Sequence, residues 1–198
     1  MMNTNKPFAE VLESSLSGWL AQSWQWDVLP QFGSMVTIET PTRTLFGVVH
    51  QIQTGSMDPV RYPFAYQKTE EELRILQPQI FEFLKTTFSC LVLGYQEKGH
   101  MYYMLAPEPA KIHAFVAPIS TENAKNFFGC HNYLNMLLGH GAQVTNLDEL
   151  LLAVLKYLAS LNITLTDHLD PFMQRYSLLI GNDYRRVKLF LQRVEQLL

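Results

Sequence analysis

The chain has 198 residues, of which 47% are hydrophobic and 17% charged, and its formal net charge is −3. This balance is typical of a globular protein and excludes an intrinsically disordered chain. The slightly acidic charge also disfavours a nucleic-acid-binding protein, which usually carries a basic stripe.

The N-terminal part of the chain is predicted to form β-strands. Residues 8–15 (FAEVLESS) nearly alternate between apolar and polar, and residues 31–40 (QFGSMVTIET) contain a short run of strand-forming residues. Residues 45–55 (LFGVVHQIQTG) alternate as a half-buried strand does, so the turn-like TPTRT before them predicts a hairpin. Gly33 is interpreted as a strand start, and Gly47 as a bulge or a close approach of the backbone.

All three tryptophans of the chain lie between the first two predicted strands, in residues 17–30 (SGWLAQSWQWDVLP). The bulk of Trp19, Trp24 and Trp26 is interpreted mainly as packing, which would cover a barrel mouth or a contact between subunits. A contact surface for another protein is the alternative interpretation.

Two short helices are predicted after a proline-punctuated loop at residues 55–69. Thr69 is placed to cap a helix over 70–76, whose first turn is acidic. Pro78 is disfavoured inside a helix and tolerated at the start of one, so a second helix is predicted over about 78–86, with a joint at Gln77. Its predicted apolar face, which would cap the barrel, consists of Ile80, Phe81, Leu84 and Phe88.

The next segment returns to a period of two. Residues 88–95 (FSCLVLGY) and 100–106 (HMYYMLA) flank the turn-like QEKG and predict a second hairpin. PEPAK then interrupts the chain, and residues 112–118 (IHAFVAP) predict one more strand.

From Ser120 to the end the pattern is helical. Ser and Thr caps begin the first segment and Gly139 and Gly141 end it, and Asn146 with Glu149 has the spacing of a capping box. These patterns predict an α+β protein with a β-barrel domain at 1–118, a helical insert at about 69–87, and a helical region at 119–198. A basic cluster near the end (Arg185, Arg186, Lys188 and Arg193) is interpreted as a solvated helix face.

The sequence indicates a cytoplasmic, soluble protein. Its N-terminus lacks the apolar core of a signal peptide, and its apolar runs fall far short of the roughly 20 residues that span a bilayer. Cys90 and Cys130 lie in apolar stretches, as free thiols in a reducing compartment do.

Motifs that carry chemistry are weak in this chain. The nearest match to a phosphate loop, Gly94–Met101, holds His100 and Met101 where lysine and a hydroxyl residue are needed, and is better explained as a hairpin turn. Cys130 and His131 are adjacent, which is not the spacing of zinc ligands. We expect no metal, no cofactor and no catalytic residue.

The APEP segment is the more informative loop. Pro107 and Pro109 hold Glu108 in an extended segment, which is preformed for docking. A rigid connector between strands is the alternative interpretation.

The order of elements and several motifs resemble the HAS-barrel proteins, small stand-alone bacterial proteins best represented in cyanobacteria. Their barrel also stands at the N-terminus of rotary ATP synthase subunits and of HerA-type DNA translocases. The resemblance covers about residues 8–118. Its most specific residues are Glu72, Arg74, Gln77, Pro78, Gln79 and Phe81, followed by Gly94, Tyr95, Pro107, Pro109, Ile112 and His113.

The resemblance implies a closed six-stranded barrel with a helical appendage. In the larger relatives this barrel does no chemistry and packs against its neighbours in a ring, and no ATPase core follows it in this sequence. We therefore expect a non-enzymatic interaction or assembly module that binds itself or another protein. The candidate contact residues are Trp19, Trp24, Trp26, Pro107, Glu108, Pro109 and His113.

Two alternatives remain open. A small-molecule or nucleotide-binding barrel, or a cryptic enzyme, would use His113, Tyr103 and Glu108 around one pocket. A DNA-translocase adaptor is suggested by analogy alone, and the acidic balance disfavours it.

Overall fold

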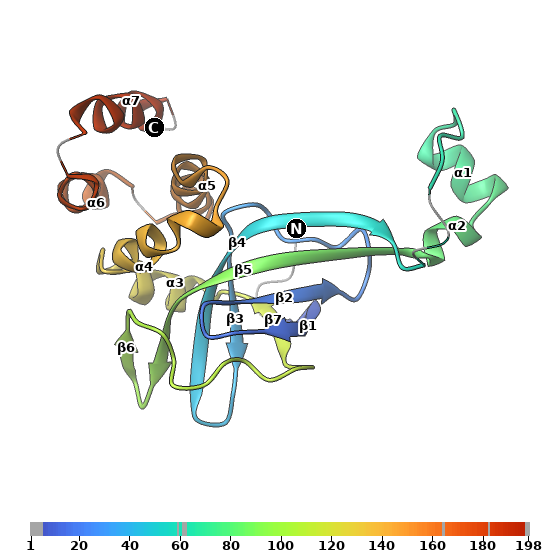
Figure 1. Cartoon of the computed structure of the whole chain (residues 1–198), viewed down its shortest axis with the longest axis horizontal. Helices are drawn as coiled ribbons and strands as arrows, with labels where there is room; N and C mark the ends of the chain where they lie inside the picture. Colours follow the sequence, from blue (N-terminus) through green and yellow to red (C-terminus); the bar gives the residue numbers. More distant parts are fainter. Residues whose placement is uncertain (1–5, 59, 61–62, 164, 182, 197–198) are drawn as a thin grey trace.

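The computed structural model describes residues 6–58, 60, 63–163, 165–181 and 183–196. Within these residues, seven strands form one antiparallel sheet, and most of the helices follow it in the chain (Figure 1). The α+β class predicted from the sequence is confirmed. The strands are β1 (Ala9–Ser14), β2 (Gly18–Ser23), β3 (Met35–Glu39), β4 (Arg43–Ser56), β5 (Leu84–Glu97), β6 (His100–Tyr102) and β7 (Phe115–Pro118).

Six of these strands close into a barrel. They follow the order β2-β1-β7-β3-β4-β5, and β2 pairs with β5 to complete the ring, while β6 extends from β5 outside it. The closed six-stranded barrel is thus confirmed, but one of its strands is not the predicted one. The Trp19 segment forms β2, and the predicted strand at 100–106 is only the short β6.

Two glycines allow close approaches, of which the sequence suggested the one at Gly47. Gly47 lies at a register shift between β4 and β5, and a Cβ atom there would collide with the Trp19 ring. Gly33 precedes β3 with a φ of +78°, and a Cβ atom there would collide with Ala153. Trp19 therefore packs against bare backbone, which explains how a large ring fits inside a small barrel.

The strands bury both faces where the C-terminal helices cover them. Because successive side chains of a strand point to opposite faces, Phe88 and Cys90 of β5 join the barrel interior, while Leu91 and Leu93 join a second core. That second core contains most of the buried residues of the C-terminal helices. These helices are α3 (Thr121–Phe128), α4 (Tyr133–Gly139), α5 (Leu147–Ser160), α6 (Leu165–Ile180) and α7 (Tyr184–Glu195).

The predicted N-caps of two of these helices are present, although the predicted capping box of Asn146 and Glu149 is only half formed, because the Glu149 carboxylate pairs with Arg193. Ser120 accepts a hydrogen bond from the backbone of Asn123 at the start of α3, and Asn146 does the same for Glu149 at the start of α5. The predicted division into domains at 1–118 and 119–198 stays a prediction. The second core contains residues from both parts.

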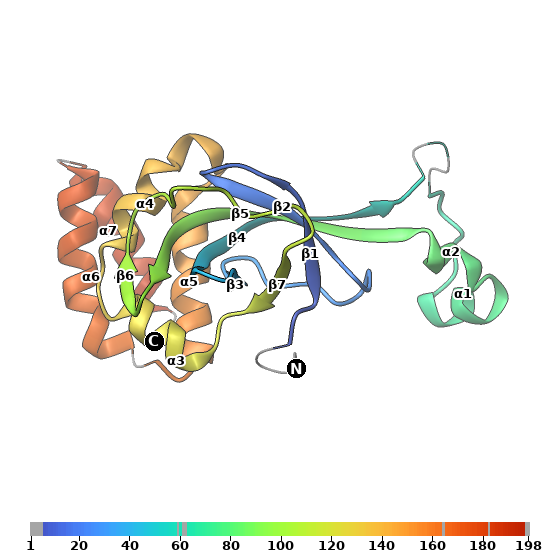
Figure 2. The same cartoon turned by 90° about the horizontal axis from the view of Figure 1, so that it is seen from below.

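Strands β4 and β5 are each 14 residues long and continue well beyond the barrel. Residues 51–56 pair with 84–89, and beyond the last pairing of β5 with β2, at Thr87, residues 54–56 and 84–86 continue as a two-stranded arm. Helices α1 (Glu70–Leu76) and α2 (Gln79–Glu82) lie at its end, far from α6 and α7 (Figures 1 and 2). We call the described residues of 57–83 the arm tip.

The arm corrects one prediction. The second helix ends at Glu82 instead of residue 86, and Leu84 and Phe88 belong to β5. Neither α1 nor α2 contains a buried residue, so they do not cap the barrel. Thr86 and Phe88 are buried in alternation along β5, and this period of two outweighs the helical spacing of Ile80 and Leu84.

No helix in the described part of the chain is long and apolar enough to cross a membrane.

Candidate interaction surface

An aromatic cluster joins the arm tip to the tryptophan segment. The ring of Trp26 stacks on that of Phe81, with centroids 5.6 Å apart and an interplanar angle of 23°. The guanidinium carbon of Arg74 lies 4.9 Å from the Phe81 ring centroid and 5.8 Å from that of Trp26. A cation over aromatic faces is attracted by their electron-rich surfaces, so Arg74 reinforces the stack.

Carboxylates fix the position of Arg74. Its Nε and Nη2 donate to Glu70 Oε1 at 3.0 and 2.8 Å, and Nη2 lies 3.7 Å from Asp27 Oδ2. Glu70 belongs to α1 and Asp27 follows Trp26 in the chain. The same guanidinium therefore holds α1 to the tryptophan segment.

A hydroxyl relay anchors the same segment to the arm. The Thr86 hydroxyl donates to the Trp26 carbonyl, and Thr86 Oγ1 lies 2.7 Å from Thr54 Oγ1 across the two strands. Since the Thr86 proton is used by Trp26, Thr54 is the donor in the second bond. The arm thus has a defined orientation at its base.

The arm tip carries several large apolar side chains that are mostly exposed. Ile75 is 81% exposed and Leu76 58%, both at the end of α1. Val60 and Phe64, in the loop before that helix, are 90% and 69% exposed. Exposed apolar side chains gathered at one place mark a contact site more often than scattered ones do.

The predicted contact residues divide between core and surface. Trp19 is buried at 3% exposure in the barrel interior, so its prediction as a contact residue is wrong. Trp24 is 52% exposed and packs edge-on against Phe115, itself 56% exposed. Pro107, Glu108 and Pro109 are exposed in the loop before β7.

The pocket predicted from His113, Tyr103 and Glu108 is not formed. Tyr103 packs against α3, where its hydroxyl donates to the Phe127 carbonyl at 2.6 Å, and burial raises the pKa of this phenol to about 12. His113 has a φ of +65° and its Nδ1 pairs with Glu10 of β1. Tyr103 and His113 therefore serve different local contacts, and Glu108 is exposed in its loop.

A family model for the HAS barrel domain matches residues 8–98. The closed barrel is therefore a HAS barrel, and the family model covers its residues 8–98. A search of curated proteins gave no match. The matched segment ends before β7, so the strand that completes this HAS barrel lies beyond it.

The first of the motifs that suggested the HAS barrel, Glu72 to Phe81, lies in the arm tip. Thr69 and Glu72 form a capping box at the start of α1, Gln77 ends that helix, and Pro78 precedes α2. Arg74 and Phe81 belong to the aromatic cluster. Trp26 of the HAS barrel segment thus anchors the arm tip through Phe81, and the motif residues form helices α1 and α2 at that tip.

A cleft beside β2 of the HAS barrel is the second candidate site. Its volume is about 270 Å³, and its lining includes Ser14, Trp19, His50 and Cys90. The Trp19 Nε1–H and the Ser14 hydroxyl are buried without a partner within the described residues. Burial lowers the pKa of His50, as does the charge of His140.

Cys90 in this cleft is not an activated nucleophile. Burial raises the pKa of the Cys90 thiol well above its ordinary value, so the thiolate does not form near neutral pH. No three His, Cys, Asp or Glu side chains among the described residues could together hold a metal ion.

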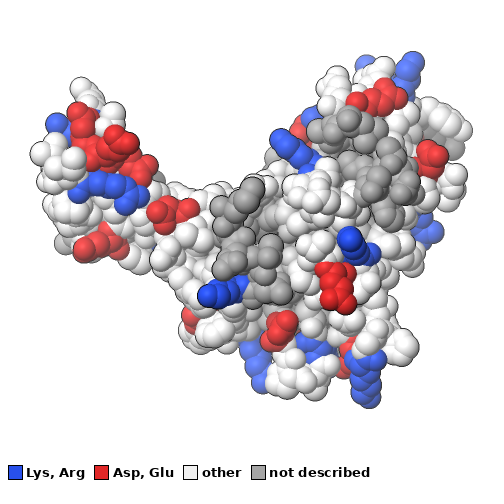
Figure 3. Space-filling view, turned by 180° about the vertical axis from the view of Figure 1, so that it is seen from behind, with Lys and Arg blue, Asp and Glu red and all other residues white. Residues whose placement is uncertain are grey.

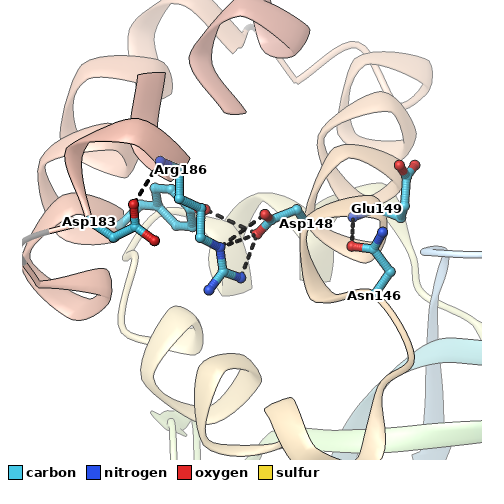
Figure 4. Close-up of polar contacts among 6 residues, drawn as sticks. Asn146, Asp148, Glu149, Asp183 and Arg186 are labelled. Atoms are coloured by element: carbon cyan, nitrogen blue, oxygen red, sulfur yellow. Dashed lines mark hydrogen bonds and ion pairs between the residues drawn. The ribbon is translucent and has the colours of Figure 1, made fainter. Parts of the chain in front are cut away.

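Ion pairs fix α7 at the end of the molecule opposite the arm. Arg186 donates to both carboxylate oxygens of Asp148, with Nη2–Oδ1 at 2.8 Å, and the Tyr176 hydroxyl donates to Asp148 Oδ1 at 3.0 Å (Figure 4). Arg193 pairs with Glu149 at 2.7 Å. Two of the four predicted basic residues, Arg186 and Arg193, therefore hold α7 on α5.

Proposed function

We propose that this HAS-barrel protein is a non-enzymatic assembly module that binds a protein through its arm tip. The observation that carries the proposal is the exposure of Ile75 and Leu76 at the end of an arm whose base is fixed by Trp26. Burying two such side chains in a partner would contribute roughly 1.5–3 kcal/mol each.

The construction of the arm supports this role. A two-stranded ribbon without a core of its own is marginally stable in water. Here the Trp26–Phe81 stack and the Thr86 bond to Trp26 stabilise a segment that contributes no buried residue from α1 or α2 to either core. Such support is expected where an exposed element must keep one orientation for a partner.

The test compares the parent protein with Ile75→Ser/Leu76→Ser. Sedimentation equilibrium measures self-association, and quantitative affinity capture measures binding of other proteins. We expect the parent protein to associate with itself or with one partner in fixed ratio, and the double variant to lose this. Leu16→Ser, which changes another exposed leucine (44%) in the β1–β2 turn, is the control.

A parent protein that stays monomeric and captures nothing would contradict the proposal. So would an arm-tip variant that binds as well as the Leu16 control.

Small-molecule binding in the cleft beside Trp19 is a second candidate. The observation in its favour is the unpartnered Trp19 Nε1–H, which donates only and therefore suits a hydrogen-bond acceptor such as a carbonyl or carboxylate. A thermal-shift screen of nucleotides and metabolites, carried out on the parent protein and on the Trp19→Phe variant, tests it. Stabilisation that survives the substitution unchanged would count against the site.

A further inference from the structure

The end of the molecule opposite the arm carries a second exposed apolar surface. Leu178 of α6 is 76% exposed, and Tyr184 and Leu189 of α7 are 80% and 52% exposed. Leu189 lies in an open groove of about 570 Å³, which is also lined by Arg185 and Phe190. We call these residues of α6 and α7 the α7 face.

The two ends differ in charge. The residues from α1 to α2 hold Glu70, Glu71, Glu72 and Glu82 against the single cation Arg74. Figure 3 shows acidic side chains gathered over the end of the arm. Glu71 and Glu82 make no ion pair within the described part of the chain.

The α7 face has the opposite uncompensated charge. Arg186 and Arg193 are neutralised by Asp148 and Glu149. Arg185 and Lys188 are exposed and, among the residues the structure describes, have no carboxylate partner. Two cations are therefore free to meet a carboxylate from elsewhere.

Charge and apolar surface have the same helical spacing at both ends. On α1, Glu71 and Ile75 are four residues apart and therefore share one face. On α7, Arg185 and Leu189 have the same spacing. A carboxylate beside the apolar Ile75 at one end thus matches a cation beside the apolar Leu189 at the other.

We propose that the arm tip of one copy docks on the α7 face of a second copy. This inference rests on the proposed assembly function and names its partner. The two surfaces lie at opposite ends of the molecule in both Figure 1 and Figure 2, so one chain does not bring its own pair together. Since the contact uses two different surfaces, each docking event leaves the other surface of both copies available to a further copy. The assembly is therefore a closed ring or an open chain.

The apolar contacts supply most of the affinity in this arrangement. Exposed ion pairs add little and are screened by salt, but they select the orientation and speed the encounter. We therefore expect association to weaken as salt is raised, without being abolished.

The test uses two charge-reversal variants. One changes the arm tip, Glu71→Arg/Glu82→Arg, and the other changes the α7 face, Arg185→Glu/Lys188→Glu. All four side chains are exposed, and none of them makes a hydrogen bond or ion pair within the described residues. Glu39→Arg/Glu122→Arg changes two other exposed carboxylates and is the control matched in net charge to the arm-tip variant.

Sedimentation velocity over a concentration series gives the outcomes. The parent protein and the control associate, while each reversal variant alone dissociates with a Kd raised on the order of tenfold or more. An equimolar mixture of the two variants associates again, because each then offers the charge that the other needs. Misfolding of either variant would not produce this recovery.

A parent protein that remains monomeric at every concentration overturns the inference. Association that neither reversal weakens, or a mixture that does not recover, also overturns it. If Ile75→Ser/Leu76→Ser abolishes binding while both reversals leave it intact, the arm tip is an assembly surface with another partner, and the proposed function stands without this inference.

Discussion

Trp26 and Phe81 stack with ring centroids 5.6 Å apart, although one follows a barrel strand and the other lies in α2 at the arm tip. Arg74 lies over both rings and pairs with Glu70. This contact is the point at which the barrel determines where the arm tip lies. Ile75, next to Arg74 in α1, is thereby held in one orientation.

Removal of the Phe81 ring is expected to loosen the arm tip and leave the barrel folded. Phe81→Ala should remove about 0.5–1.5 kcal/mol of stacking together with the cation contact of Arg74. Hydrogen exchange should then accelerate in the arm tip and stay unchanged in β3 and β7. The control is Phe64→Ala, whose ring packs on Tyr66 instead of Trp26. Equal exchange in both variants would contradict the anchoring role.

Substitution of Trp19 should lower the free energy of unfolding far more than substitution of Trp24. Trp19→Ala empties the barrel interior beside Gly47 and should lower the free energy of unfolding by about 3–5 kcal/mol. Trp24→Ala removes a ring that is 52% exposed and should cost well under half of that. Chemical denaturation of both variants measures the difference. Similar values for the two would contradict the buried position of Trp19.

The Asp148–Arg186 pair should stabilise the packing of α7 on α5. Asp148→Ala removes bonds from Arg186 and Tyr176, and we expect a loss of about 1–2 kcal/mol, limited because the Arg186 side chain is 38% exposed. A double-mutant cycle with Arg186→Ala isolates the pair. The Glu149–Arg193 pair, with both side chains nearly half exposed, is the control and should give a smaller coupling.

His50 should make the stability depend on pH in the acidic range. Burial and the charge of His140 lower the pKa of His50 below 6.5 in the folded state. Above pH 6.5 the imidazole is neutral in both states; below it the unfolded chain takes up a proton more readily, so stability falls with falling pH until the folded pKa is passed. Melting temperatures between pH 7.5 and 5 should show a shallower fall for His50→Asn than for the exposed control His100→Asn.

The sequence predicted those elements whose signals lie within a few residues. Thr69 and Glu72 form their capping box from a single turn, and the 40–44 hairpin comes from a local turn signal. Trp19, Ala21 and Ser23 are buried in alternation along β2, but their period of two was obscured by the tryptophans, which suggested packing or contact. The sequence indicated a close approach to the backbone at Gly47, but it did not identify the Trp19 ring as the group that approaches.

The arm tip could not be predicted as a contact surface from the sequence, for a different reason. Residues Ile80, Phe81, Leu84 and Phe88 satisfy a helical period, and only the burial of Thr86 and Cys90 shows that the strand begins at Leu84. The stack of Trp26 on Phe81 is a tertiary contact between distant segments. The exposure of Ile75 depends on the direction of the arm, which is set by the pairing of β4 with β5.

Site-specific crosslinking from position 75 tests the central claim most directly. A photoreactive amino acid in place of Ile75 should form an adduct between two copies of the chain, and peptide mapping should locate it within Tyr184–Glu195 of the second copy. The same group at Leu16 should form no such adduct. Adducts that are absent from position 75, or that map equally over the whole surface, would contradict the account.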